Sequence, residues 1–146
     1  MADTITFTIP GKPVAKGRAR AFVRNGRVAH YTPKETADYE RLVRETAQEA
    51  MIGQAPLDGP VALVVIALVP IPASWSRRRQ QAAGAGATVP TSRPDLDNIV
   101  KAIKDGLNGV AWRDDSQVVE LRARKSYGHT PCVQVRVRAM QVAEVN

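Results

Sequence analysis

The chain has very few of the residues that build disulfide frameworks and zinc sites. Cys132 is its only cysteine, so no disulfide can form within the chain, and its only histidines are His30 and His129. No cysteine and histidine cluster therefore has the spacing of a zinc site. The longest apolar run, VALVVIALV from Val61, is far too short for a membrane helix. The first residues, MADTITFTIPG, also lack the charged and apolar regions of a signal peptide. We expect a cytoplasmic protein that does not enter a membrane.

Negative charge is scarce as well. The 146 residues include 21 Lys and Arg against 14 Asp and Glu, which gives a net charge of +7. Such an excess indicates a polyanionic partner, with nucleic acid first and a membrane surface second, although a chain can also be basic without any such partner. The length favours one domain, spanning residues 1–146, with enough chain to bury a core.

The hydrophobic pattern predicts an α/β fold of the α+β kind, with a mixed β-sheet and two main helices packed on it. The continuous run from Val61 to Ile71 is typical of a strand buried on both faces in the middle of a sheet. We expect a short helix, capped by Ser74, to carry Arg77, Arg78 and Arg79. The strands that begin near Val118 and Val133 are expected to pair with each other through the turn at 128–131. The other predicted elements are a strand at 4–9, a helix from Thr32–Pro33 to about Met51 and a helix from Pro94 to about Asn108.

A basic segment, KPVAKGRARAFVRNGRVAHY, follows the first predicted strand and contains no acid. Asn25-Gly26 predicts a hairpin turn, because both residues tolerate positive φ. Like charges repel one another unless an anion lies across them, so the segment is a candidate DNA contact, with a solvated loop as the alternative. The predicted DNA-binding residues here are Lys12, Lys16, Arg18, Arg20, Arg24 and Arg27.

The stretch RPDLDNIVK concentrates negative charge at the start of the second main helix. Asp95 and Asp97 could be capping residues, since acids are favoured in a first turn. Two carboxylates about 4 Å apart, however, repel by ~4 kcal/mol at an effective dielectric constant of 20. The helix dipole returns only ~0.3–1 kcal/mol for each. A partly buried pair therefore needs a cation, and Lys101, one turn after Asp97, supplies a single charge.

A second acidic pair, Asp114 and Asp115, follows this helix. If the strand after it begins beside the helix N-terminus, three carboxylates and a lysine would converge. Oxygen ligands in that number suit Mg²⁺ or Mn²⁺. Such a site inside a basic surface is suited to cleaving phosphodiester bonds, because the surface holds the polyanion and the metal activates the attacking water.

The block RPDLDNIVKAIKDGLNGVAWRDDSQVVEL resembles the signature of the RusA-type Holliday-junction resolvases, many of them encoded by phages or prophages. IPGKPVAKGRAR, PIPASWSRRR and RKSY resemble further family features, so the likeness covers most of the chain. The resemblance implies a Mg²⁺-dependent homodimer with a mixed α/β fold that nicks four-way DNA junctions symmetrically. It also implies that Asp95, Asp97 and Asp115 are catalytic metal ligands and that Lys101 is the essential lysine.

Several residues keep more than one interpretation. Arg93 and Lys125 join the predicted DNA-binding set, although Lys125 could equally be an exposed strand residue. Asp114 is a candidate turn residue, and Asp105 is expected to pair with Lys101 or face solvent. Trp75 is either a core lid or a base-stacking residue. Four arginines alternate along the two last predicted strands and form either a basic sheet face or a solvated outer face: Arg122, Arg124, Arg136 and Arg138.

Two other functions remain alongside the structure-selective endonuclease. One is a nucleic-acid-binding protein without catalysis, whose acids are only caps and ion pairs. The other is a phosphatase or nucleotidase, against which the large basic excess argues, because a mononucleotide does not need so many cations.

Overall fold

The strands of the protein form one mixed sheet and one separate hairpin. The computed structural model describes residues 3–17, 20–141 and 143. The four-stranded sheet has the order β1-β6-β4-β5, and the hairpin consists of β2 and β3. The strands span β1 Thr4–Pro10, β2 Arg20–Arg24, β3 Arg27–Tyr31, β4 Val61–Pro70, β5 Val118–Gly128 and β6 Cys132–Ala139. The helices span α1 Lys34–Ala50, α2 Arg77–Gly84, α3 Leu96–Leu107 and the 3₁₀ turn η1 Asp115–Gln117.

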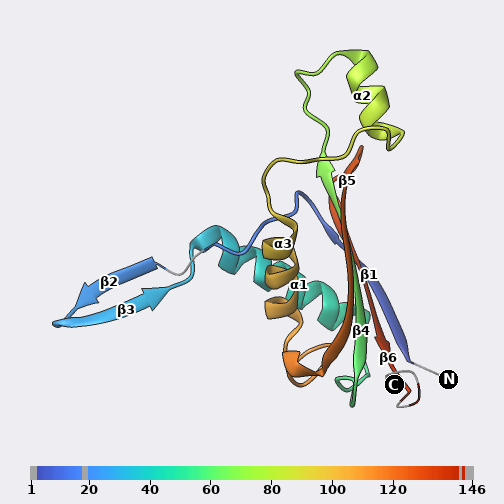
Figure 1. Ribbon diagram of the computed structural model, residues 1–146. Coiled ribbons are helices and arrows are strands. Elements are labelled where there is room, and N and C mark those ends of the chain that lie inside the picture. The colour runs from blue at the N-terminus through green and yellow to red at the C-terminus, as the bar shows by residue number, and fades with distance from the viewer. Residues whose placement is uncertain (1–2, 18–19, 142, 144–146) are drawn as a thin grey trace.

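Helices α1 and α3 cover one face of the sheet and leave the other face open (Figure 1). This confirms the predicted α+β arrangement of a mixed sheet with two main helices, and α2 is a third, shorter helix beyond one end of the sheet. Among the described helices, none is long and apolar enough to cross a membrane.

Strand β4 occupies the sheet interior, as its unbroken apolar run predicts. It pairs with β5 in parallel and with β6 in antiparallel orientation. The prediction that β5 and β6 pair with each other is therefore wrong. The β4 side chains on the helix-covered face, among them Leu63 and Val65, are buried. Those on the other face, Val64, Ile66 and Leu68, are half-buried, so the predicted burial on both faces holds only in part. β4 takes the place between β5 and β6, and residues 129–131 pass over its end.

The two main helices approach each other closely where α3 carries Gly106. A Cβ atom at this position would lie 2.6 Å from Val43 Cγ1 and 3.0 Å from the carbonyl oxygen of Glu40. The first distance is shorter than real Cβ contacts and the second is unusually tight, so the helices could not pack this closely around a larger residue without a shift. The spacing of Leu96, Val100, Ile103 and Leu107 predicts the apolar stripe of α3. Ile103 and Leu107 are fully buried and Val100 is buried, whereas Leu96 is only half-buried. Ile99, which the predicted stripe did not include, is also fully buried.

The hairpin β2–β3 extends away from the sheet and the helices (Figure 1). Its turn is the predicted Asn25-Gly26, with φ values of 54° and 73°, and Arg24 pairs with Arg27 across it. Phe22 and Tyr31 meet edge to face, with ring centroids 5.7 Å apart. Val23 and Val28 are 74% and 66% exposed, so this arm has almost no core of its own.

The structure around α2 tests two predictions, the N-cap of the helix and the role of Trp75. The cap of α2 is Ser76 rather than Ser74, since the Ser76 hydroxyl accepts a hydrogen bond from the Arg79 backbone N–H at 3.2 Å. Trp75 packs edge to face on Tyr127, with centroids 5.4 Å apart, and the Arg79 guanidinium lies 3.8 Å from its ring centre. These contacts favour the packing interpretation of Trp75 over base stacking.

Candidate active site

Asp95 occupies the N-cap position of α3 without acting as a cap. Its backbone has the extended conformation of an N-cap, and its carbonyl accepts the first helical hydrogen bond from Ile99 at 3.1 Å. Its side chain, however, accepts no capping hydrogen bond. Asp97 lies in the first turn and is exposed. Within the part of the chain that the structure describes, no ion pair involves Asp95, Asp97 or Asp115. Helix capping therefore does not account for the two carboxylates of α3.

Asp115 is held far more firmly, in the rigid turn η1. The indole N–H of Trp112, a fully buried side chain, donates to Asp115 Oδ1 at 2.8 Å. Gln117 fastens the same turn to the segment before β4, because its side-chain amide donates to the carbonyls of Leu57 and Gly59, both at 2.9 Å. One carboxylate oxygen of Asp115 is thus anchored by the core while the other stays available.

Asp114 serves the turn, as the sequence suggested. Its carboxylate accepts hydrogen bonds from the hydroxyl of Ser116 and, at 2.9 Å, from its backbone N–H. The side chain of Gln117 accepts from the Asp114 backbone N–H at 3.0 Å, which completes a capping box. The Ser116 hydrogen bonds lower the pKa of Asp114 from its ordinary value. Of the four acids, Asp114 is the one with a structural role.

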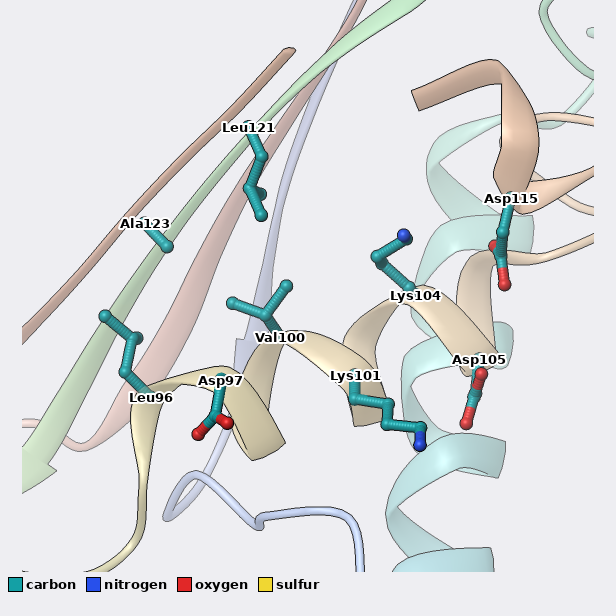
Figure 2. A pocket seen from close by; sticks show the side chains of 9 residues that line it. All are labelled: Leu96, Asp97, Val100, Lys101, Lys104, Asp105, Asp115, Leu121 and Ala123. Carbon is teal, nitrogen blue, oxygen red and sulfur yellow. The ribbon is translucent and has the colours of Figure 1, made fainter. Parts of the chain in front are cut away.

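The structure does not bring the three predicted ligands together within one chain. Asp97 and Asp115 line the same hollow between α3 and β5, together with Lys101 and Lys104, whereas Asp95 faces a different hollow beside residues 12–17. Figure 2 shows Asp97 at the N-terminal end of α3 and Asp115 beyond its other end, near Asp105. Because an α-helix rises about 1.5 Å per residue, Asp97 and Asp105 are separated by about 12 Å along the axis.

The distance between these carboxylates determines whether a single chain can bind a divalent metal ion with all of them. Carboxylates bind Mg²⁺ at about 2.0–2.1 Å, so one ion cannot span a gap of that length. In the described ranges, 3–17, 20–141 and 143, no group of three or more His, Cys, Asp or Glu side chains could hold a metal. The donor chemistry of the acids suits Mg²⁺, but their arrangement within a single chain does not.

Lys125 has internal partners at the entrance to α3. Its amine donates to the carbonyl oxygens of Ser92 and Pro94, at 2.7 and 2.9 Å. The peptide bond between Arg93 and Pro94, which lies between these two carbonyls, is cis. Lys125 thus ties β5 to the residues immediately before Asp95, and this contact favours a positioning role over the predicted DNA contact.

Lys16 is likewise engaged inside the protein. Its amine forms ion pairs with Glu40 at 2.5 Å and with Asp105 at 3.0 Å, and its backbone N–H donates to the Asn98 carbonyl at 2.9 Å. Burial alone would lower the pKa of Lys16, but the hydrogen bonds with Glu40 and Asp105 outweigh burial and the pKa is raised. Asp105 therefore pairs with Lys16, not with Lys101 as its helical spacing suggested. Lys16 joins the loop after β1 to both main helices.

The remaining predicted DNA-binding residues are spread over one exposed loop and the hairpin. Lys12 and Arg93 are exposed and line the hollow that Asp95 faces. Arg24 and Arg27 are exposed at the hairpin tip. Arg18 lies outside the described residues, and of Arg20 only the backbone, at the start of β2, is described.

The anchoring role of Trp112 is not predictable from the sequence pattern. Trp112 precedes Asp115 by three residues, and this spacing is the only hint of a contact in the sequence. Spacing alone does not predict that the indole is buried or that it donates a hydrogen bond to the acid. The same holds for Lys125, whose two carbonyl acceptors lie more than thirty positions earlier in the chain.

Comparison with known proteins gives consistent matches over nearly the whole chain. A family model described as endodeoxyribonuclease RusA matches residues 10–138. Protein YqaN of Bacillus subtilis (strain 168), described as uncharacterized, is 38% identical over 138 residues, which is 93% of this chain and 96% of that protein. The matched region contains Asp95, Asp97, Lys101 and Asp115.

Proposed function

Because the chain belongs to the RusA family of endodeoxyribonucleases, we propose that it resolves four-way DNA junctions with divalent metal ions, by paired symmetric nicks in DNA recombination and repair. The family acts on branched DNA junctions. A junction is resolved by two nicks in strands related by a two-fold axis, so one site per chain calls for a homodimer.

The observation that supports this function most directly is the uncapped carboxylate of Asp95. An acid at an N-cap position usually accepts a hydrogen bond from the first turn, and this one does not. With Asp97 two residues on and Lys101 one turn further, α3 presents two carboxylates and an ammonium group at its exposed end. These groups suit metal binding and phosphate binding better than they suit helix stability.

Each side chain then has a specific task. Asp95, Asp97 and Asp115 lie too far apart within one chain to share an ion, so they would hold Mg²⁺, or Mn²⁺ in its place, only where the homodimer brings them together. The bound ion would supply a polarised phosphoryl oxygen and an activated water. Lys101 neutralises negative charge that develops on the phosphate. Trp112 fixes the orientation of the Asp115 carboxylate. Lys125 fixes the residues before Asp95 by its bonds to two carbonyls.

The hairpin β2–β3 is the element best placed to bind a DNA arm. A two-stranded ribbon fits the major groove, which is about 12 Å wide. The hairpin extends from the body of the protein and carries Arg24 and Arg27 at its tip (Figure 1). In this arrangement both arginines contact phosphates, and the exposed Val23 and Val28 are covered by the nucleic acid.

Replacing Arg24 and Arg27 together by alanine should weaken junction binding and flatten its salt dependence. Each lost phosphate contact lowers the slope of log K against log salt concentration by about one, so the slope should fall by about two. Binding titrations at several salt concentrations measure this slope. Arg41→Ala is the matched control, because Arg41 lies 3.6 Å from Asp38 in an ion pair on α1. A slope that stays unchanged in the double variant would remove the hairpin from the DNA contact.

The proposed function is tested by incubating the protein with a labelled four-way junction or a linear duplex of the same sequence, with Mg²⁺ or with EDTA. We expect paired nicks in the junction only when the metal is present. Cleavage in EDTA would contradict the metal requirement, and equal cleavage of the linear duplex would contradict the selectivity for branched DNA. Salt-sensitive junction binding with no cleavage under any metal would favour the non-catalytic binding protein.

A further inference from the structure

Helix α2 carries three consecutive arginines in its first turn, Arg77, Arg78 and Arg79, which we call the arginine turn. All three are exposed, and the turn contains no acid. Positive side chains are disfavoured at this end of a helix, because the helix dipole already places partial positive charge there. The arginine turn therefore costs α2 stability, and formation of the helix does not explain why it is present.

The charges of the arginine turn are not neutralised by acids of the protein. Among the residues that the structure describes, no ion pair involves Arg77, Arg78 or Arg79. Residues 70–94, which connect the end of β4 to the entrance of α3, include four arginines and no acid. Arg79 lies over the ring of Trp75. Like charges in such a segment repel one another unless an anion lies across them, so Arg77 and Arg78 suit an external anion.

Helix α2 is docked on the end of the sheet. Trp75 packs against Tyr127, near the end of β5. A Cβ atom at Gly84 would lie 2.7 Å from His129 Nε2, so the last residue of α2 touches the loop between β5 and β6. Between these two contacts, the Gln80 side-chain amide donates to the Trp75 carbonyl at 2.8 Å. These contacts hold the arginine turn in a defined position relative to the sheet.

Strand β5 connects this position to the proposed active site. Lys125 bonds to the two carbonyls that lie directly before Asp95. Tyr127, two residues further along β5, contacts Trp75 beside the arginine turn. Residues two apart in a strand lie on the same face, about 6.6–6.8 Å from each other. The arginine turn and the N-terminal end of α3 are therefore attached to the same end of β5.

Helix α2 and the hairpin β2–β3 extend from the body of the protein in different directions (Figure 1). The hairpin carries Arg24 and Arg27 at its tip, and α2 carries the arginine turn. A straight duplex that follows one of these projections leads away from the other. The arms of a four-way junction leave a common centre in different directions, so one arm can follow each projection.

We propose that the arginine turn of α2 binds the phosphate backbone of a second junction arm, next to the proposed active site, while the hairpin binds a different arm. A branched DNA engages both contacts of a chain at once, whereas a linear duplex engages one of them. The two contacts together therefore favour four-way junctions over linear DNA. The selectivity for junctions rests on the proposed function, but the DNA contact of α2 is measurable without cleavage.

The contact is tested by binding titrations in EDTA, which prevents cleavage during the measurement. Replacing Arg77 and Arg78 together by alanine should weaken junction binding by roughly 10–100-fold near 0.1 M salt and lower its salt slope by about two, because two phosphate contacts are lost. Binding to a linear duplex of the same sequence should weaken much less, because the hairpin still offers its own contact. Alanine preserves the helix, and Arg79 is kept because it packs on Trp75.

Charge reversal separates a DNA contact from a structural role of the arginines. Acids are favoured in the first turn of a helix, so the variant Arg77→Glu/Arg78→Glu should unfold at the wild-type temperature or above it. Its junction binding should nevertheless fall further than that of the alanine variant, because glutamates repel phosphates. The matched control, Arg41→Ala/Arg44→Ala, removes two cations from α1, where Arg41 lies 3.6 Å from Asp38 and Arg44 donates to the Asp105 carbonyl at 3.4 Å. It should bind the junction as wild type does.

Unchanged junction affinity in both α2 variants, or an equal loss for the junction and the linear duplex, would overturn the proposal. It is also overturned if these variants keep their junction affinity but lose binding to vesicles of anionic lipid, because the arginine turn then faces a membrane surface. If α2 contributes to junction binding but wild type cuts no junction with any metal, the nuclease function fails and the α2 contact stands. If wild type cuts junctions and the α2 variants bind them equally well, the function stands and the contact fails.

Discussion

Replacing Asp97 by asparagine is expected to abolish junction cleavage and leave junction binding intact. The substitution preserves the size of the side chain but removes the charge that a divalent ion requires. Asp97 is exposed and has no ion pair among the described residues, so the fold does not depend on its charge. We expect the cleavage rate to fall by at least a thousandfold, which corresponds to about 4 kcal/mol of transition-state stabilisation.

Single-turnover cleavage and band-shift titration, each carried out with the same junction, measure the two halves of this prediction. The matched control is Asp38→Asn, which removes one carboxylate from the second turn of α1, where Asp38 pairs with Lys34 at 2.7 Å. That variant should cut at close to the wild-type rate. If Asp97→Asn loses binding as strongly as cleavage, or keeps its cleavage rate, Asp97 is not a metal ligand.

Replacing Trp112 by phenylalanine should lower cleavage by about 10–100-fold, the usual cost of losing a residue that orients a metal ligand. Phenylalanine keeps an aromatic ring in the core but cannot donate the hydrogen bond that reaches Asp115 Oδ1 at 2.8 Å. The Asp115 carboxylate would then rotate freely, and its affinity for the metal would fall. Part of the activity should therefore return at high Mg²⁺ concentration, which a rate measurement across a Mg²⁺ titration detects.

A loss of stability has to be separated from this effect. Trp112 is fully buried, and the smaller ring leaves a cavity, so thermal unfolding of Trp112→Phe should begin at a lower temperature. The informative control is Leu107→Val, a core truncation at another fully buried position, whose side chain cannot form a hydrogen bond to an acid. It should lower the unfolding temperature and leave the Mg²⁺ dependence of cleavage unchanged. An unchanged Mg²⁺ dependence in Trp112→Phe would reduce the role of Trp112 to packing.

The sequence predicted the elements of the fold better than their neighbours in the sheet. The alternation of β1, the apolar run of β4 and the stripe on α3 are local patterns, and each appears at the expected place. The pairing of β5 was predicted wrongly because Gly128 to Pro131 looks like a hairpin turn. Whether such a turn joins neighbouring strands depends on where the most apolar strand lies, and this is a property of the whole sheet.

The same limit applies to the site. Composition and spacing identified Asp95 and Asp97 as unusual acids in a basic chain, and the family resemblance selected Asp115 from the pair Asp114 and Asp115. Their positions relative to one another depend on the length of α3 and on the turn η1, which places Asp115 beyond the far end of the helix. The internal bonds of Lys16 and Lys125 were equally hidden, because their partners lie far away in the sequence.

The position of β6 in the sheet makes completion of the fold depend on residues that are synthesised after all of the proposed catalytic groups. Residues 132–139 form the only partner of β1 within the described sheet and one of the two partners of β4. While the chain emerges from the ribosome, β1 must therefore wait without a neighbour until nearly all of the other elements have been made. The side chains proposed to act in DNA cleavage all precede β6 in the sequence. They acquire a stable scaffold only when β6 pairs with both β1 and β4. A partly synthesised chain that lacks β6 would be held back from cutting DNA by its unfinished sheet.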